Sequence, residues 1–521
     1  MARILVTEEI ADSGLDRLRA AGHEVDVQLG TSPQQLVEAM RTANALIIRS
    51  ATDVTAALLA EAPELVVVGR AGIGLDNVDV EAATQRGVMV VNAPESNILS
   101  AAEHTMALLL AQARNIPQAH AALVAGRWER AKWEGVELAD KTLGVIGLGR
   151  IGRLVAQRAA AFGMRIIAHD PYVSPERARQ MSIEVVELDE LLAESDFITL
   201  HVAKTPETMG LLNADRLART KPGVRIINVA RGGLIDEQAL ADAVRSGHVA
   251  GAAIDVFATE PTTSSPLFDL PQVVVTPHLG ASTREAQDKA GDTIAEMVGL
   301  ALDNEFVPFA VNVSAGEVSE TTKPYLALAE RLGALFVALA EGVPDVLEVG
   351  FHGQIAAGDT RILTVAVLKG LFSRGSAVPV SYVNAPLMAA DRGIDVRESR
   401  STTAVDYVNL LTIRGGHHSL AGTVASVSGE QRLVRVDDNI VDLPPAQNML
   451  YVRNEDRPGM IGKVGTILGE SSVNIDDMDV GRDPNGDASM MILATDRPVA
   501  PDVVQRLRAT PGIVSAHAMH S

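Results

Sequence analysis

The segment from Lys141 to Phe162 constrains the fold of this chain more than any other. Residues 141–146 form a short apolar run, Gly-Leu-Gly-Arg-Ile-Gly follows at 147–152, and residues 151–162 carry Ala, Leu and Val at helical spacing. In a strand, glycine turn and helix of this kind, the glycines permit a tight turn, close approach of a pyrophosphate, and packing of the helix on the strand. The segment therefore predicts a parallel α/β sheet that binds a dinucleotide at the amino terminus of the helix.

The next predicted strand, 165–169, indicates which dinucleotide is bound. It ends at Asp170, about 20 residues beyond the glycine turn, where an acidic side chain accepts hydrogen bonds from the adenosine ribose. Such a carboxylate also repels a 2′-phosphate, so NAD is favoured over NADP. The cofactor-binding residues predicted from this part of the chain are Gly147, Gly149, Arg150, Ile151, Gly152 and Asp170.

Three side chains suited to acid–base chemistry and carboxylate binding each follow a predicted strand: Arg231, Glu260 and His278. Because ligands of open α/β sheets bind at the carboxyl ends of the strands, we expect the three to share one crevice. A carboxylate fixes the tautomer of a bonded imidazole, which makes His278 the candidate acid/base and Glu260 its partner. Arg231 can hold a substrate carboxylate bidentately. The combination predicts hydride transfer on a small hydroxy or keto acid.

Residues 228–234, 255–261 and 276–283 resemble, in order and spacing, the signatures of the D-isomer-specific 2-hydroxyacid dehydrogenases. The resemblance implies an NAD-dependent dehydrogenase with His278 as acid/base, Glu260 as its orienting partner and Arg231 as the substrate clamp. It also places Asp255 near the nicotinamide carboxamide and Thr205 along the cofactor cleft. The residues that the resemblance adds to the cofactor site are Thr205, Ala230, Arg231, Asp255, His278 and Gly280.

Two loops near the amino terminus, 49–52 and 69–79, resemble the substrate loops of those family members that oxidise 3-phosphoglycerate in L-serine biosynthesis. This likeness implies that Arg49 and Arg70 face the substrate phosphate and that Gly72, Ile73 and Gly74 meet its carboxylate. Three alternatives stay open: the arginines are solvated loop residues, the substrate is another acid such as hydroxypyruvate, glyoxylate or 2-oxoglutarate, or the chain is a non-enzymatic NAD sensor.

Residues 449–521 have the order strand, helix, strand, strand, helix, strand, with a hairpin turn at Asn485-Gly486, which is the ferredoxin-like pattern. Residues 454–459 and 472–475 resemble the amino-acid-binding ACT domain. The resemblance implies that L-serine is an effector bound between paired domains by Asn454, Asp456 and Asn474. Alternatively, these short polar side chains serve only a turn and a helix cap.

Residues 320–447 predict an α+β domain, with helices at 324–340 and 383–390, a strand at 361–367 and a hairpin at 424–434. We find no catalytic constellation in it. In the long form of the resembled enzymes an intervening domain is regulatory and binds anions, but the loop 437–442 is acidic and lacks the basic residues that such a site needs.

The predicted fold class is therefore α/β, with two Rossmann-like doubly wound domains followed by an α+β intervening domain and a ferredoxin-like ACT domain. A long helix at 100–125 is expected to cross into the cofactor domain and, by family likeness, to help form a dimer or tetramer. A helix at 285–302 returns the chain. The expected domains are a substrate domain of residues 1–97 and 287–311, an NAD-binding domain of 98–286, an intervening domain of 312–447 and an ACT domain of 448–521.

Composition excludes several classes of function. The 521 residues contain no cysteine, so thiol nucleophiles, disulfides and thiolate metal sites are excluded, and no His-Glu-x-x-His spacing indicates another metal site. The net charge is −21 without a basic stripe, which argues against nucleic-acid binding. No apolar run approaches the ~18 residues of a membrane span, and residues 1–10 are too acidic for a signal peptide, so we expect a cytoplasmic protein.

Overall fold

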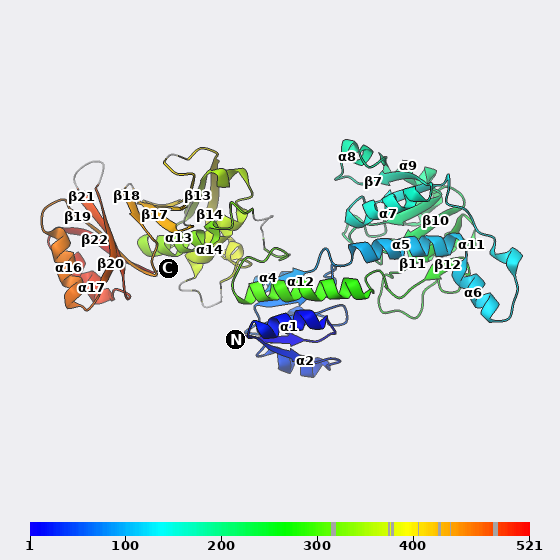
Figure 1. Cartoon of the computed structure of the whole chain (residues 1–521), viewed down its shortest axis with the longest axis horizontal. Helices are drawn as coiled ribbons and strands as arrows, with labels where there is room; N and C mark the ends of the chain where they lie inside the picture. Colours follow the sequence, from blue (N-terminus) through cyan, green and yellow to red (C-terminus); the bar gives the residue numbers. More distant parts are fainter. Residues whose placement is uncertain are drawn as a thin grey trace.

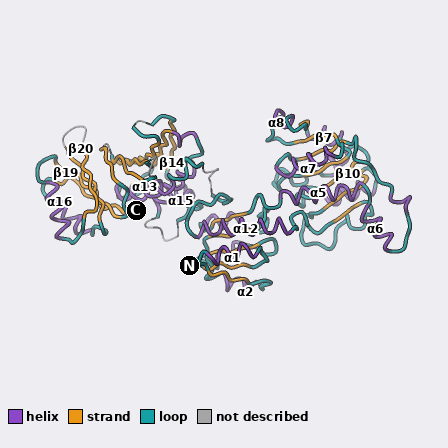
Figure 2. Tube along the Cα trace, viewed as in Figure 1, coloured by secondary structure: helices purple, strands orange, loops and turns teal. Residues whose placement is uncertain are grey.

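The computed structural model describes residues 1–313, 319–373, 376, 380–404, 406–425, 429–437, 439–482 and 488–520. It contains four sheets of five, seven, six and four strands. The seven-stranded sheet and the four-stranded sheet lie near opposite ends of the long axis of the molecule, and the other two lie between them (Figure 1). Helices cover both faces of the first two sheets (Figure 2), as the alternation of apolar strands and amphipathic helices predicts.

The first sheet has the order β2-β1-β3-β4-β5 and is entirely parallel. Helices α1 and α12 cover one face, and α2, α3 and α4 cover the other. Helix α12 returns to this sheet from the cofactor domain, as predicted. The elements are β1 (Arg3–Val6), α1 (Asp12–Ala20), β2 (Glu24–Val27), α2 (Pro33–Met40), β3 (Ala45–Ile48), α3 (Ala56–Ala60), β4 (Val67–Arg70), α4 (Val80–Gln85), β5 (Met89–Asn92) and α12 (Arg284–Leu302).

The second sheet has the order β12-β11-β10-β9-β6-β7-β8, also entirely parallel. This is the doubly wound order of dinucleotide-binding folds extended by one strand, with its switch point between β6 and β9. The elements are α5 (Ile98–Ala113), α6 (Ile116–Val124), η1 (Arg130–Trp133), β6 (Thr142–Ile146), α7 (Arg150–Ala161), β7 (Arg165–His169), α8 (Pro175–Arg179), β8 (Glu184–Val185), α9 (Leu188–Glu194), β9 (Phe197–Leu200), α10 (Ala214–Ala218), β10 (Val224–Asn228), α11 (Glu237–Arg245), β11 (Val249–Ile254) and β12 (Val273–Val275).

The single helix predicted at 100–125 is two helices, α5 and α6. The helical path is interrupted at Asn115, which adopts a φ of 51°, and Pro117 lies in the first turn of α6. A proline inside a continuous helix clashes with the carbonyl four residues earlier, at a cost of about 3 kcal/mol. Ending one helix and starting another removes that clash, because proline is well tolerated in a first turn.

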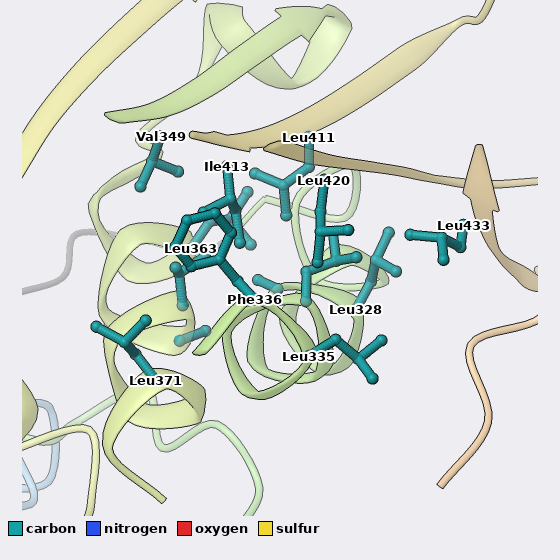
Figure 3. Close-up of a cluster of buried hydrophobic side chains, with 14 of the residues drawn as sticks. Leu328, Leu335, Phe336, Val349, Leu363, Leu371, Leu411, Ile413, Leu420 and Leu433 are labelled. Carbon is teal, nitrogen blue, oxygen red and sulfur yellow. The ribbon is translucent and has the colours of Figure 1, made fainter. Parts of the chain in front are cut away.

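The third sheet has the order β14-β13-β15-β16-β17-β18, with one parallel pair, β13 and β14, and antiparallel pairs elsewhere. Helices α13 and α14 pack together on one of its faces, where Phe336, Leu363 and Leu411 meet in a buried apolar cluster (Figure 3). The elements are α13 (Tyr325–Leu339), β13 (Val346–Gly353), η2 (Gln354–Ala357), α14 (Arg361–Phe372), α15 (Ala385–Asp391), β14 (Asp395–Ser401), β15 (Asn409–Gly415), β16 (His418–Val424), β17 (Gln431–Val436) and β18 (Asn439–Leu443).

Two sequence predictions in this domain are wrong. The strand predicted at 361–367 belongs to helix α14, whose residues from Ile362 to Phe372 are all buried. A helix that is buried on every side shows no 3.6-residue periodicity, so its apolar run resembles that of a buried strand. The acidic loop predicted at 437–442 is mostly strand β18, which alternates buried and exposed residues beside β17.

The fourth sheet is antiparallel with the order β20-β21-β19-β22, which confirms the ferredoxin-like prediction. Helices α16 and α17 cover one face. Met449, Tyr451 and Met490 on the other face join the buried cluster of the third sheet, so the two domains share a core. Residues Asn485 and Gly486 of the predicted turn lie outside the described residues. The elements are β19 (Asn448–Glu455), α16 (Met460–Glu470), β20 (Ile475–Arg482), β21 (Ala488–Thr495), α17 (Pro501–Arg508) and β22 (Ile513–His520).

None of the helices in the described part of the chain combines the length and the apolar character that crossing a bilayer requires.

Candidate active site

The centre of the site is a hydrogen-bonded pair formed by His278 and Glu260. Atom Nδ1 of His278 lies 2.5 Å from Oε2 of Glu260, and Oε1 of Glu260 accepts the Phe257 amide at 2.7 Å. Burial acts to raise the pKa of Glu260, but the bonds from His278 and the Phe257 amide outweigh it, and the pKa lies below its usual value. An ionised carboxylate on Nδ1 keeps the proton on that nitrogen, which leaves Nε2 of His278 to exchange a proton with a ligand.

The loop that carries His278 is held by Asp255. His278 adopts a φ of 56°, which is uncommon for a residue other than glycine, and its amide donates to the Asp255 carbonyl at 2.8 Å. The buried Asp255 carboxylate accepts the amides of Leu279 and Gly280 at 2.8 and 2.9 Å. It also accepts the hydroxyl of Thr276 at 2.6 Å and faces Nε2 of His104 at 3.2 Å.

These hydrogen bonds determine the charge and the structural role of the Asp255 carboxylate. Burial acts to raise the pKa of Asp255, but the hydrogen bonds, with that of His104 the largest, outweigh it and lower the pKa. The carboxylate is therefore an ionised anchor beneath the loop, and Asp255 is not among the residues that line the cavities of the site. A contact with the nicotinamide carboxamide stays a prediction.

Arg231 reaches across from the end of β10 toward the substrate domain. Its Nε lies 3.4 Å from Oδ2 of Asp76, and its Nη1 donates to the Ala230 carbonyl at 2.8 Å. Asn228 fixes the turn by donating to the Arg231 carbonyl at 2.9 Å and accepting the Ala230 amide at 3.0 Å. A Cβ at Gly74 would lie 2.6 Å from Nη2 of Arg231, so the glycine leaves room for this guanidinium in its present position.

Arg70 supplies a second cation from the end of β4. A Cβ at Gly72 would lie 1.7 Å from Nη1 of Arg70, so this glycine makes room for the guanidinium. Burial, followed by the nearby charge of Arg231, lowers the pKa of Arg70, while Asp76 and Glu8 act in the opposite direction. The Nε of Arg70 is buried and has no hydrogen-bond partner within the described ranges. An unpaired buried guanidinium N–H beside other cations suits an anionic ligand.

Two adjoining cavities connect these groups. One, of about 740 Å³, is lined by Arg49, Arg70, Glu260 and His278 among others. The second, of about 400 Å³, is lined by Ile73, Gly74, Ile151, Ala230, Arg231, His278 and Gly280 among others. His278 and Asp76 line both cavities. His278 therefore borders one cavity that Arg231 lines and another that Arg49 and Arg70 line.

The glycine turn has the geometry that a pyrophosphate requires. Gly147 adopts a φ of 93°, and a Cβ at Gly152 would lie 2.1 Å from the Gly147 carbonyl oxygen. A Cβ at Gly149, by contrast, would meet no protein atom within 4 Å, so its absence leaves open space at the amino terminus of α7. Phosphate oxygens fit such a space. Ile151 lines the cavity, whereas the exposed side chain of Arg150 pairs with Glu95 at 2.9 Å.

Asp170 lies beside this turn at the end of β7. Its oxygens accept the amides of Leu148 and Tyr172 at 2.7 and 2.9 Å. Each carboxylate oxygen keeps a further acceptor position for a ribose hydroxyl. Thr205 lies just beyond Lys204, where this segment leaves the cavity lining, and its hydroxyl contacts that of Thr208 at 3.2 Å. The residues around the turn thus fit NAD, although no contact of Thr205 with the cofactor follows from the geometry.

The predicted effector residues do not come together within one chain. Asn454 and Asp456 precede helix α16, and Asn474 follows it, so an 11-residue helix of about 16 Å separates them. Asn454 is 2% exposed, and its Oδ1 is buried without a hydrogen-bond partner within the described ranges. Asp456 is exposed, and Nδ2 of Asn474 donates to Asp476 at 3.2 Å. Within one ACT domain the predicted effector residues therefore fall into two separate groups.

Three polar residues of the site have no role in the sequence-based prediction: Glu8, Asp76 and His104. Glu8 lies two residues beyond the end of β1, so the rule that led to Arg231, Glu260 and His278 also applies to it. Asp76 lies in the substrate-loop motif at 69–79, but the resemblance implies no role for its side chain. His104 lies on a helix far from the motifs in sequence, and no local signal marks its contact with Asp255.

Comparison with known proteins agrees with this geometry. Residues 106–280 match the NAD-binding domain of the D-isomer-specific 2-hydroxyacid dehydrogenases, residues 321–437 the intervening domain of D-3-phosphoglycerate dehydrogenase, and residues 448–512 the ACT domain. The chain is 50% identical to a D-3-phosphoglycerate dehydrogenase of Mycobacterium leprae, with 96% of each chain covered.

Solved structures resemble the first half of the chain. The TT0316 protein of Thermus thermophilus is 37% identical, with a TM-score of 0.56, and the similarity covers 59% of this chain and 99% of that one. An NAD-dependent formate dehydrogenase of Staphylococcus aureus, solved in complex with NAD, is 30% identical, with a TM-score of 0.53, covering 59% and 97%. The chain belongs to the D-3-phosphoglycerate dehydrogenases, within the D-isomer-specific 2-hydroxyacid dehydrogenase family.

Proposed function

We propose that this protein oxidises 3-phosphoglycerate to 3-phosphohydroxypyruvate with NAD, the first step of L-serine biosynthesis by the phosphorylated pathway. The observation that supports this proposal is that the His278–Glu260 pair opens onto cavities that Arg49, Arg70 and Arg231 also line. A substrate with a carboxylate at one end and a phosphate at the other matches cations that line two cavities meeting at one acid/base. A non-enzymatic NAD sensor has no need of that arrangement.

In the proposed reaction, Arg231 binds the substrate carboxylate and orients C2 and its hydroxyl toward Nε2 of His278. NAD, when bound, accepts the hydride from C2. His278 takes the hydroxyl proton at Nε2, and the ionised Glu260 on Nδ1 stabilises the imidazolium that forms. Arg49 and Arg70 bind the phosphate. The cleft lies between two domains, and its closure excludes water from the hydride transfer.

The test is NADH formation from 3-phosphoglycerate, with hydroxypyruvate, glyoxylate and 2-oxoglutarate compared in the reductive direction. We expect 3-phosphohydroxypyruvate to have the highest kcat/KM among the keto acids. In the variant His278→Ala, we expect kcat to fall by about 10² to 10⁴, the range of general acid–base catalysis. Turnover near that of the wild type would remove His278 from the mechanism, and a preference for a keto acid without phosphate would move the assignment to another substrate.

We further propose that L-serine binds between ACT domains of two chains and inhibits the enzyme. The two groups at opposite ends of α16 support this pairing, because Asn474 of one chain would complete the site of Asn454 and Asp456 of another. The protein is then a homo-oligomer, a dimer or tetramer. We expect L-serine to inhibit the wild type and not the variant Asn474→Ala. Light scattering should show that the variant forms the same oligomer. Full inhibition of that variant would contradict it. The cytoplasmic location stays a prediction.

A further inference from the structure

Loop 49–52, which carries Arg49, closes around the carboxylate of Glu8. Oε1 of Glu8 accepts the amides of Arg49 and Thr52 at 2.9 and 3.0 Å, and Oε2 accepts those of Ser50 and Ala51, both at 3.1 Å. Successive amides directed at one point form an anion-binding concavity of the kind that holds phosphates. Here a side chain of the protein itself occupies that concavity.

The same loop is also fixed through its carbonyl groups. Nδ2 of Asn77 donates to the carbonyls of Arg49 and Thr52 at 2.9 and 2.6 Å, and the hydroxyls of Thr7 and Thr52 lie 2.9 Å apart. The backbone of the loop is therefore held on two sides before any ligand binds. Binding that needs no loop ordering avoids the entropic cost of that step.

The guanidinium of Arg49 makes few hydrogen bonds to other protein groups, so it is available to bind a ligand. Within the described ranges, this guanidinium donates one long hydrogen bond, of 3.5 Å, to the carbonyl of Glu9, and Arg49 lines the larger cavity together with Arg70. The charge of Glu8 also acts on Arg70, since it works to raise the pKa of that guanidinium against the effect of burial. A carboxylate inside a phosphate-binding region is unfavourable unless it has another task.

We propose that Glu8 is a positioning residue for phosphate recognition. It fills the concavity of loop 49–52, so that the substrate phosphate meets the side chains of Arg49 and Arg70 rather than the amides of the loop. This proposal rests on the proposed function, because it assigns the means by which the same site selects a phosphorylated substrate. A substrate without phosphate makes no use of this loop.

The variant Glu8→Gln tests the proposal. Glutamine offers one acceptor oxygen and turns N–H groups toward the loop amides, so at least two of the four bonds are lost and the loop is released. We expect the KM for 3-phosphohydroxypyruvate to rise about tenfold or more, the effect of losing a charge-assisted hydrogen bond. The kcat should change little. The kcat/KM for hydroxypyruvate, measured with enough enzyme, should stay within about twofold.

Glu38→Gln is the matched control, because Glu38 is an exposed residue of α2 in the same domain, it lines neither cavity, and its substitution removes the same charge. Asn77→Ser is a second variant, which loosens the loop from its carbonyl side if Glu8→Gln does not fold. Thermal unfolding of the full chain reports folding in each case. We expect the KM for 3-phosphohydroxypyruvate to rise in both Glu8→Gln and Asn77→Ser while the kcat/KM for hydroxypyruvate is kept. Glu38→Gln should behave as the wild type with both keto acids.

Three results would overturn the proposal. Equal losses with both keto acids would mean that Glu8 only supports the fold, and equal losses in Glu8→Gln and Glu38→Gln would mean that the effect is one of net charge. A lower KM for 3-phosphohydroxypyruvate in Glu8→Gln would mean that Glu8 competes with phosphate for the amides. A wild-type enzyme that does not use 3-phosphohydroxypyruvate would instead contradict the proposed function, so the two failures are distinguishable.

Discussion

Replacing Glu260 by glutamine separates the orientation of His278 from its proton transfer. The substitution keeps the size of the side chain but removes the charge facing Nδ1 of His278, at 2.5 Å. A hydrogen bond to a charged group is worth about 1.5–3 kcal/mol and a neutral one about 1 kcal/mol. The side chains of His278 and Glu260 are 47% and 31% exposed, so solvent screening places the loss at about 1–2 kcal/mol.

At 1.36 kcal/mol per factor of ten, this loss lowers kcat/KM about 5- to 30-fold. The assay is initial-rate NADH formation from 3-phosphoglycerate, with the wild type and Glu260→Gln measured in parallel. Glu237→Gln is the matched control, because Glu237 holds the same loop through the Ala258 amide at 2.7 Å without touching His278. Its kcat/KM should stay within about twofold of the wild type.

Two outcomes would refute this reasoning. A Glu260→Gln enzyme as active as the Glu237→Gln control would show that the carboxylate does not assist His278. A loss of about 10³ or more, in the range of removing the acid/base itself, would show that the carboxylate sets the tautomer of His278 outright and that the estimate of about 1–2 kcal/mol is wrong.

Three further predictions concern the cofactor, the ion pair between α13 and α14, and pH. Asp170→Ser should raise the KM for NAD about tenfold or more and allow NADP to be used, because a charged acceptor of the ribose hydroxyls is lost; steady-state kinetics with both cofactors checks this. Lys369→Met should lower the stability by about 3 kcal/mol, seen in denaturant titration, because it leaves Glu330, 3.0 Å away, without the buried cation. A shift below about 1 kcal/mol would make the pair dispensable. Asp255→Asn should be less stable than the wild type at neutral pH, and the difference should shrink as the pH falls below about 4, since a carboxyl with a lowered folded-state pKa stabilises above its unfolded value. Thermal midpoints against pH test this, and a constant difference would contradict it.

The site was largely predictable because parallel strands end at the same edge of a sheet. Arg231 follows β10, Glu260 lies beyond β11, and His278 lies beyond β12, and these three strands are neighbours. Local sequence placed each side chain at a strand end, and the general rule for open sheets brought them to one crevice. The distance of 2.5 Å between His278 and Glu260 needed the structure, because it depends on how two loops pack.

What the sequence could not supply are features set by tertiary packing. Helix α14 was mistaken for a strand because burial on all sides erased the periodicity that distinguishes helix from strand. The contact of His104 with Asp255 joins residues 151 positions apart, and no pattern within either segment indicates it. Asn454 and Asn474 lie at opposite ends of α16 because of the direction in which the chain runs through the last domain. The resemblance to the ACT domain names these residues as ligands but carries no information about that direction.

The carboxylates around the cleft explain how a chain of net charge −21 can offer a site to anions. Glu8, Glu260, Asp255 and Asp170 each accept one or more backbone amides. An amide N–H satisfies a carboxylate without consuming a cation, so these acids fix the loops while guanidinium groups keep their capacity for ligands. Asp76 differs, since it faces Arg231 directly and is 60% exposed to solvent, where its field is screened. The placement of acids against N–H donors, rather than the net charge, therefore decides whether this cleft attracts a substrate with two anionic groups.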